Sequence, residues 1–179
     1  MKNVVALKTI EAGERFTFNG QKFIALEQLE EGTLAITEEC IEDRAFNDRR
    51  QEILNDWKTS SLREYLNKEY LEAQLDEEAL LEMEVDLTAD DGLDDYGKDK
   101  CKVALLSLDQ YRKYRKVLGE PIEDWWWLVT PYSTASNGFS RHVRFVGSGG
   151  SSIGTSAYYG LRGVRPLCTL KSEILVSKG

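Results

Sequence analysis

The sequence predicts an α+β fold in which two helices accompany short β-strands. Three observations support this prediction: a hairpin signal near the N-terminus, two segments with helix-start signals, and short β-like runs after residue 124. With 179 residues, of which 41% are apolar and 10% aromatic, the chain is long enough to bury a sizeable core. We therefore expect one domain over residues 1–179, with an N-terminal β-meander at about residues 9–37 as an integral part of it.

The meander begins with a tight hairpin. Apolar residues at 16–18 and 23–26 flank Asn19 and Gly20, a pair favoured where both central residues of a two-residue turn take positive φ. A third run, residues 33–37, alternates apolar and polar side chains, which is typical of a half-buried strand.

Two segments carry the start signal of a helix. Ser61 with Glu64, and Ser107 with Gln110, fit the capping box, in which the serine oxygen accepts from a backbone N–H and the later side chain returns a hydrogen bond. Apolar residues follow each box at helical spacing. We expect helices over about residues 62–73 and from residue 108 to a stop at Gly119.

The C-terminal part changes to short β-like runs separated by loops rich in Ser and Gly. Residues 125–130, which begin with three tryptophans, and residues 141–146 are rich in strand formers. Alternation in a strand sends Trp125 and Trp127 to one face and Trp126 to the other, so at least one face is expected in the core.

Charge is distributed unevenly along the chain. Residues 1–124 carry 30 acidic against 17 basic side chains, whereas residues 125–179 carry 1 against 6. We expect the arginines of the second part to pair with acids of the first, and a surface for an anionic ligand or partner stays open as the alternative. The net charge of −8 and the lack of a basic stripe argue against nucleic acid. The arginines are Arg141, Arg144, Arg162 and Arg165.

Neither export nor a membrane is indicated. No run approaches the roughly 18 apolar residues that span a bilayer, and the first residues are too interrupted for a signal peptide. Cys40, Cys101 and Cys168 are odd in number and far apart, so we expect reduced, buried thiols and no disulfide framework.

Few residues point to chemistry. The acidic stretch from Asp86 to Asp95 does not fit an EF-hand register, which leaves a solvated loop or an irregular calcium site. His142 is the only histidine, which excludes histidine-based zinc and iron sites. Residues 147–154 are glycine-rich but lack the Gly-Lys-Ser/Thr end of a phosphate loop. We therefore predict no catalytic residue, no metal ligand and no cofactor.

Three segments together resemble a known family. Residues 55–67 (NDWKTSSLREYLN), 125–131 (WWWLVTP) and 163–170 (GVRPLCTL) resemble an uncharacterised bacterial and prophage family, domain of unknown function 6273, over roughly residues 10–176. The resemblance implies a C-type-lectin-like α+β fold with two main helices, small twisted antiparallel sheets and long loops. It also implies a setting in the cytoplasm or on a phage particle.

The resemblance implies a non-enzymatic binding domain that recognises a protein or glycan through its C-terminal loops. Two alternatives stay open: a redox or metal-dependent enzyme that uses Cys168, Cys101 or the acidic loop from Asp90 to Asp95, and a structural subunit of a larger assembly. The sequence leaves the oligomeric state open. The amphipathic mixture expected at the binding surface comprises Tyr132, Asn137, Phe139, Ser151, Tyr158 and Tyr159.

Overall fold

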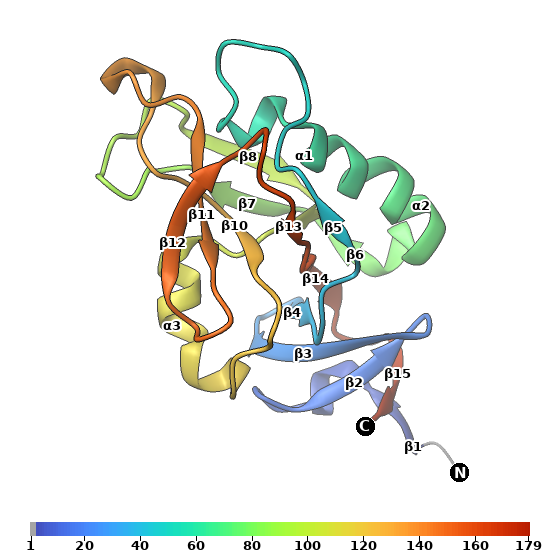
Figure 1. Cartoon of the computed structure of the whole chain (residues 1–179). Coiled ribbons are helices and arrows are strands. Elements are labelled where there is room, and N and C mark those ends of the chain that lie inside the picture. Colours follow the sequence, from blue (N-terminus) through green and yellow to red (C-terminus); the bar gives the residue numbers. More distant parts are fainter. Residues whose placement is uncertain (1–2) are drawn as a thin grey trace.

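Strands dominate the protein. The computed structural model describes residues 3–179, with 36% of the residues in strands and 21% in helices (Figure 1). Within this part of the chain, none of the helices has the length and apolar character needed to cross a membrane.

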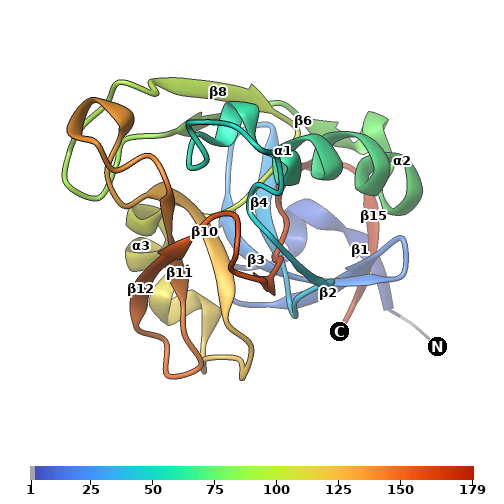
Figure 2. The same ribbon diagram turned by 45° about the horizontal axis from the view of Figure 1, so that its top comes forward.

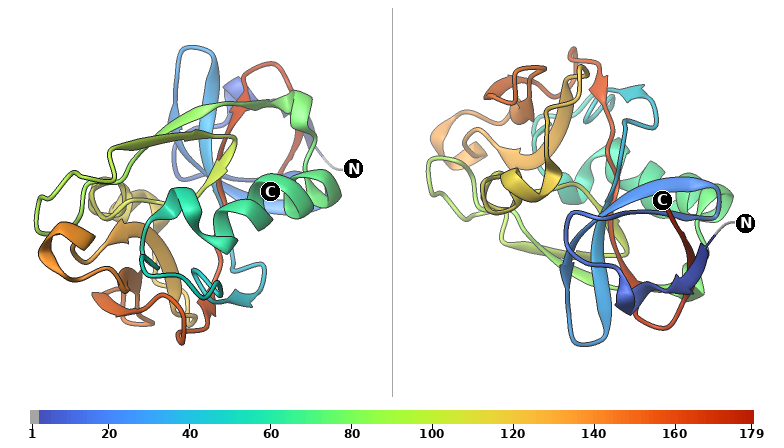
Figure 3. Two further views of the ribbon diagram at one scale, coloured as in Figure 1. Left: turned by 90° about the horizontal axis from the view of Figure 1, so that it is seen from above. Right: turned by 90° about the horizontal axis from the view of Figure 1, so that it is seen from below.

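The largest element is an antiparallel sheet of eight strands that curls into a half-barrel. Seen from below in Figure 3, the N-terminal strands and the C-terminal strand wrap around each other next to both chain ends. The first and last strands pair, so Asn3 lies opposite Lys178. In order across the sheet the strands are β1 (Asn3–Ala6), β15 (Leu175–Lys178), β2 (Arg15–Phe18), β3 (Gln21–Gln28), β4 (Gly32–Thr37), β14 (Leu167–Lys171) and β6 (Leu80–Leu81), and β9 (Val103–Ala104) also pairs with β14.

A second sheet has five strands, and a third has two. The five-stranded sheet is antiparallel except where β10 and β13 run parallel. Its order is β12 (Ser152–Ser156), β11 (His142–Val146), β10 (Trp126–Pro131), β13 (Arg162–Gly163) and β5 (Asp43–Arg44). The two-stranded sheet pairs β7 (Met83–Asp86) with β8 (Lys98–Cys101).

Two helical segments lie on opposite sides of the molecule (Figure 2). The first consists of α1 (Ser61–Tyr65), a π-helical segment (Leu66–Tyr70) and α2 (Leu71–Gln74), and the second is α3 (Leu108–Leu118). Short 3-10 turns occur at Leu7–Thr9, Trp57–Thr59, Glu77–Ala79 and Ala135–Asn137.

Two apolar clusters form the core. The larger cluster joins the first helical segment to both large sheets, with Phe46, Trp57 and Trp127 among its fully buried members. The smaller cluster packs α3 against β3, β4 and β10, and includes Leu108, Tyr111 and Trp126. Because the larger cluster takes the Trp127 face of β10 and the smaller one takes the Trp126 face, this strand is buried on both sides.

The fold class expected from the resemblance is wrong. The protein is mostly β, with a curled sheet of eight strands and two short helical segments, and not a C-type-lectin-like α+β fold with two main helices and small sheets. The reason is long-range strand pairing: β14 inserts next to β4, and β15 pairs with β1 and β2. Local patterns predict where strands form but carry no information on such partners.

Most local predictions hold. Asn19 and Gly20 have φ of 48° and 80° and connect β2 to β3, which confirms the hairpin. The Ser107 capping box is present, and Gly119 ends α3 with φ of 80°. The other capping box is wrong by one residue: Ser60 accepts from the Arg63 backbone at 3.1 Å and caps α1.

The third run of the meander is also more buried than its pattern predicts. All six residues of β4 are buried, although alternation indicated a half-buried strand. Ala35 enters the larger cluster, while Leu34 and Ile36 enter the smaller one. Both faces of the strand are therefore covered, and its threonines lie inside the molecule.

Candidate functional site

The side chain of Asn55 holds the loop between β10 and β11. Its amide nitrogen donates to the backbone carbonyls of Ser133, Phe139 and His142 at 2.9, 2.9 and 3.0 Å. Its side-chain oxygen accepts from the Tyr96 hydroxyl at 2.8 Å. Because Asn55 is fully buried, water does not compete for these hydrogen bonds. One amide therefore fixes both the beginning and the end of the loop.

The acidic segment between β7 and β8 supports the same loop. Asp91 accepts from the Ser133 hydroxyl at 2.5 Å, and Asp95 accepts from the Thr134 hydroxyl at 2.7 Å. These hydrogen bonds hold the pKa of both carboxyls below the ordinary value. Residues 3–179 contain no group of three or more His, Cys, Asp or Glu side chains arranged to hold a metal ion. The carboxylates considered for calcium thus bind hydroxyl groups of a neighbouring loop.

Two rings of the β10–β11 loop form an exposed aromatic pair. The ring centroids of Tyr132 and Phe139 are 6.2 Å apart, and the residues are 42% and 50% exposed. The Arg144 guanidinium lies 4.7 Å from the Tyr132 centroid and forms an ion pair with Asp90. This pair confirms that an arginine of the basic C-terminal part binds an acid of the preceding part.

A second aromatic pair lies on the connection between β12 and β13. The rings of Tyr158 and Tyr159 meet edge to face with centroids 4.8 Å apart, and Tyr159 is 83% exposed. Tyr158 packs against the larger apolar cluster and lines an open hollow of about 440 Å³ together with Arg44 and Asp48.

The six residues expected to form one surface lie in three places. Alternation along β11 directs Arg144 to one face of the five-stranded sheet. Tyr132 lies on the same face, because its ring contacts the Arg144 guanidinium. The neighbours of Arg144 in β11 enter the larger cluster on the other face, where Tyr158 packs. Asn137 shares the loop of Tyr132 and Phe139. Ser151 precedes the first residue of β12, whereas Tyr158 and Tyr159 follow the last residue of that strand. The structure thus brings Tyr132 and Phe139 together on the loop that also carries Asn137, and it brings Tyr158 and Tyr159 together elsewhere.

The segment of residues 163–166 (GVRP) has a structural role centred on Arg165. This side chain is 3% exposed, donates to the Thr37 carbonyl at 2.9 and 3.1 Å and to the Glu38 carbonyl at 2.9 Å, and lies 4.7 Å from the Trp126 ring. Burial lowers the pKa of Arg165 to about 10. Arg165 therefore tethers the end of β4, instead of forming the carboxylate pair expected from the sequence.

The three cysteines lie apart from any reactive arrangement. Cys101 and Cys168 are buried, as expected, while Cys40 is half-buried, and all three are free. Burial raises the pKa of each thiol to about 12. The thiolate that a redox or nucleophilic cysteine requires is therefore disfavoured near neutral pH at all three positions.

This environment predicts slow thiol chemistry in the folded protein. With a disulfide reagent at neutral pH, we expect Cys168 to remain unmodified in native buffer and all three thiols to react after denaturation. Mass spectrometry of the modified peptides measures both. Rapid native modification of Cys168 would support the enzyme alternative instead.

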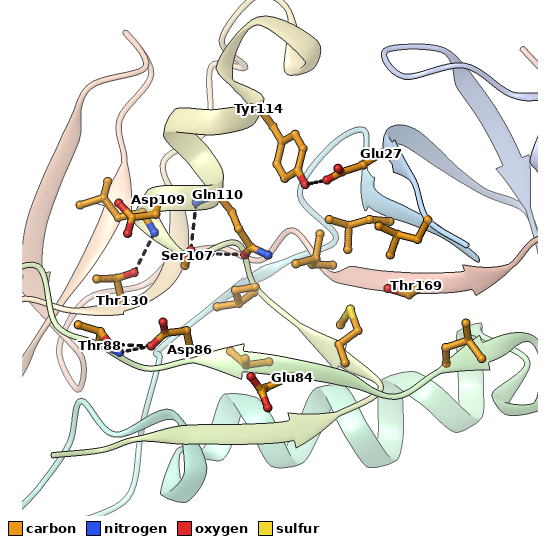
Figure 4. Close-up of a pocket in the computed structure, with 18 of the residues that line it drawn as sticks. Glu27, Glu84, Asp86, Thr88, Ser107, Asp109, Gln110, Tyr114, Thr130 and Thr169 are labelled. Carbon is orange, nitrogen blue, oxygen red and sulfur yellow. Dashed lines mark hydrogen bonds between the residues drawn. The ribbon is translucent and has the colours of Figure 1, made fainter. Parts of the chain in front are cut away.

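A groove of about 770 Å³ lies on another side of the molecule (Figure 4). It is bordered by the end of the β3–β4 hairpin, by β7, by the start of α3 and by β14. The sequence did not reveal this groove, because its walls come from segments between residues 27 and 169. Residues 27–31 and 82–90 are rich in acids, and this pattern is the one sequence signal that could have indicated an acidic surface here.

Taken together, the fold and these surfaces define a mostly β protein with exposed aromatic loops. Residues 84–172 match the family described as a domain of unknown function, DUF6273, which supports the uncharacterised family expected from the sequence. The match spans just under half of the chain and includes two of the three segments that carry the resemblance, residues 125–131 and 163–170. Searches of curated proteins and of solved structures found no match.

Proposed function

We propose that the protein is a non-enzymatic binding domain that recognises a protein or glycan through Tyr132 and Phe139. The observation that carries this proposal is a pair of half-exposed rings on a loop fixed by the buried Asn55 amide. Because the loop is already ordered, a partner would meet a surface that loses little further conformational entropy on binding. Aromatic rings with polar neighbours provide contacts for either kind of partner.

We also propose a bacterial or prophage setting, within the cell or on a phage particle. The sequence resemblance alone supports this part, since the C-type-lectin-like comparison no longer applies. Neighbouring genes for tail or reverse-transcriptase proteins would support it, and a conserved neighbourhood of metabolic genes would contradict it.

The binding proposal predicts the effect of removing both rings. Wild-type protein is first screened against immobilised glycans and a phage-displayed random peptide library. For any ligand found, we expect the Tyr132→Ala/Phe139→Ala variant to lose at least about tenfold in affinity, because buried aromatic contacts dominate such interfaces. Isothermal titration measures the change.

Two further variants make the result specific. Leu175→Ala removes an exposed apolar side chain (67% exposed) from β15 and should bind like wild type. The Tyr158→Ala/Tyr159→Ala variant tests the other face of the five-stranded sheet. Retained binding by a folded Tyr132→Ala/Phe139→Ala variant would contradict the proposal, as would loss of binding caused only by the tyrosine-pair variant.

A further inference from the structure

The groove of Figure 4 combines an apolar floor with an acidic rim. Its floor is formed by side chains that are almost entirely buried, among them Leu105, Leu108 and Leu167. Leu29, at the end of the β3–β4 hairpin, adds a side chain that is 45% exposed. Because the floor itself has little contact with water, the apolar surface that a ligand can remove from water is mainly that of Leu29 and the partly exposed Leu81 and Met83.

The rim is strongly negative. Eight of the lining residues are Asp or Glu, and Arg112 is the one Lys or Arg among those described as lining the groove. Arg112 itself is held by Asp109 and Asp90 at 2.9 and 3.8 Å. Glu27 and Glu84 pair with Lys113 and Lys98. Four of the eight acids form no ion pair with other residues in the range 3–179, namely Glu30, Glu31, Glu82 and Asp86, and their charge has no counter-charge there. The eight acids are Glu27, Glu30, Glu31, Glu82, Glu84, Asp86, Asp90 and Asp109.

One wall of the groove is an unpaired strand edge. Strand β7 pairs with β8 on one side, and its consecutive residues line the groove on the other. The hydrogen bond from the Leu87 N–H to the Gly97 carbonyl at 3.0 Å sets the antiparallel pattern, in which every second residue bonds to the partner strand. The backbone groups of Glu84 and Asp86 therefore point away from β8. They form a template to which an extended chain can add.

The alternation of β7 also specifies the added strand. Met83 and Val85 turn toward the apolar clusters, whereas Glu84 and Asp86 are exposed. Cross-strand neighbours lie on the same face of a sheet, so alternate residues of an added strand would lie next to Val85 or next to the two acids. Apolar side chains suit the first set, and Lys or Arg suits the second.

We propose that this groove binds an extended peptide segment of another protein, in which basic and apolar residues alternate, by adding it as a strand to the free edge of β7. Backbone hydrogen bonds from Glu84 and Asp86 hold the peptide, its apolar side chains cover the floor, and its basic side chains meet the acidic rim. This site is separate from the Tyr132–Phe139 pair, and its test is independent of that proposal.

The test uses a fluorescent peptide of sequence Lys-Val-Lys-Val-Lys-Val and measures fluorescence polarisation at low ionic strength. We expect the full chain to bind this peptide saturably. It should not bind the control peptide in which Glu replaces each Lys. The triple variant Glu30→Gln/Glu31→Gln/Glu82→Gln should bind about tenfold more weakly, because three charge pairs are lost. The matched variant Glu69→Gln/Glu72→Gln/Glu78→Gln changes the net charge equally at exposed positions outside the groove, and should keep wild-type affinity.

A chemically altered peptide separates strand addition from simple charge attraction. Two peptides are prepared, one N-methylated at every lysine and the other at every valine. Each lacks the backbone N–H donors of one edge and keeps its charges. The peptide that lacks the donors facing β7 should bind about tenfold more weakly or worse. Circular dichroism confirms that each protein variant is folded. Equal binding by the two triple variants would overturn the proposed site, and equal binding by both N-methylated peptides would overturn strand addition.

Discussion

Replacing Asn55 with alanine is expected to lower the free energy of unfolding by roughly 3 kcal/mol or more. The variant would remove a hydrogen bond from three loop carbonyls and from the Tyr96 hydroxyl. The His142 carbonyl would keep the Tyr132 N–H and the Tyr96 oxygen would keep the Ala135 N–H, so the Ser133 and Phe139 carbonyls lose most. A buried polar group without a partner loses its interaction with water and receives nothing in return. Urea unfolding followed by fluorescence measures the change.

The same substitution should also release the loop that carries Tyr132 and Phe139. Amide hydrogen exchange between β10 and β11 is expected to accelerate in Asn55→Ala, and any ligand of the aromatic pair should bind more weakly. Asn137→Ala is the matched control, since it removes the same kind of side chain from an exposed position on that loop, at a cost of about 0.5 kcal/mol or less. If both alanine variants are equally stable, Asn55 is not the support that its contacts indicate.

Trp127→Ala is expected to destabilise the protein by about 3–5 kcal/mol, the range typical of removing a buried tryptophan. Trp127 is fully buried, with ring centroids 5.8 Å from Phe46 and 6.4 Å from Phe145. Its indole N–H donates to the Arg44 carbonyl at 2.8 Å, so the side chain also connects β10 to β5. The variant would leave a large cavity at the junction of the larger cluster with the five-stranded sheet.

The neighbouring Trp125 offers a control of identical chemistry two residues away. Trp125 is 46% exposed and stacks on Phe145 with centroids 5.7 Å apart. Trp125→Ala should therefore cost about 1 kcal/mol, because much of its surface is already in water. Thermal and urea unfolding of both variants measure the difference, and similar losses at the two positions would contradict the assignment of Trp127 to the core.

The tryptophan segment illustrates how far a local pattern can be followed. Alternation correctly predicted that Trp125 and Trp127 share one face while Trp126 takes the other, since period-two geometry holds in any strand. It did not predict that Trp126 would be covered as well. That burial depends on α3, whose Tyr111 ring lies 5.6 Å from Trp126, and on the Arg165 guanidinium.

The candidate site was predictable only in part. Tyr132, Asn137 and Phe139 lie within a few residues of one another, so their proximity follows from chain connectivity. Tyr158, Tyr159 and Ser151 were expected on the same surface because they have similar chemistry, but they are separated by the faces and ends of the five-stranded sheet. Asn55 lies within a segment recognised from the sequence, yet its role required knowledge of partners some eighty residues away.

The sequence by itself determined the local elements of this protein: the Asn19-Gly20 hairpin, the Ser107 capping box and the strand character of residues 125–130. These features depend on φ preferences, neighbouring hydrogen bonds and side-chain alternation, all of which act over a few residues. Only the tertiary structure decided that β14 and β15 complete a curled sheet begun by β1 to β4, and that β7 keeps a free edge above an acidic groove. Strand partners and groove walls are set by packing between distant segments, and a strand's own residues do not encode which other strand will lie beside it.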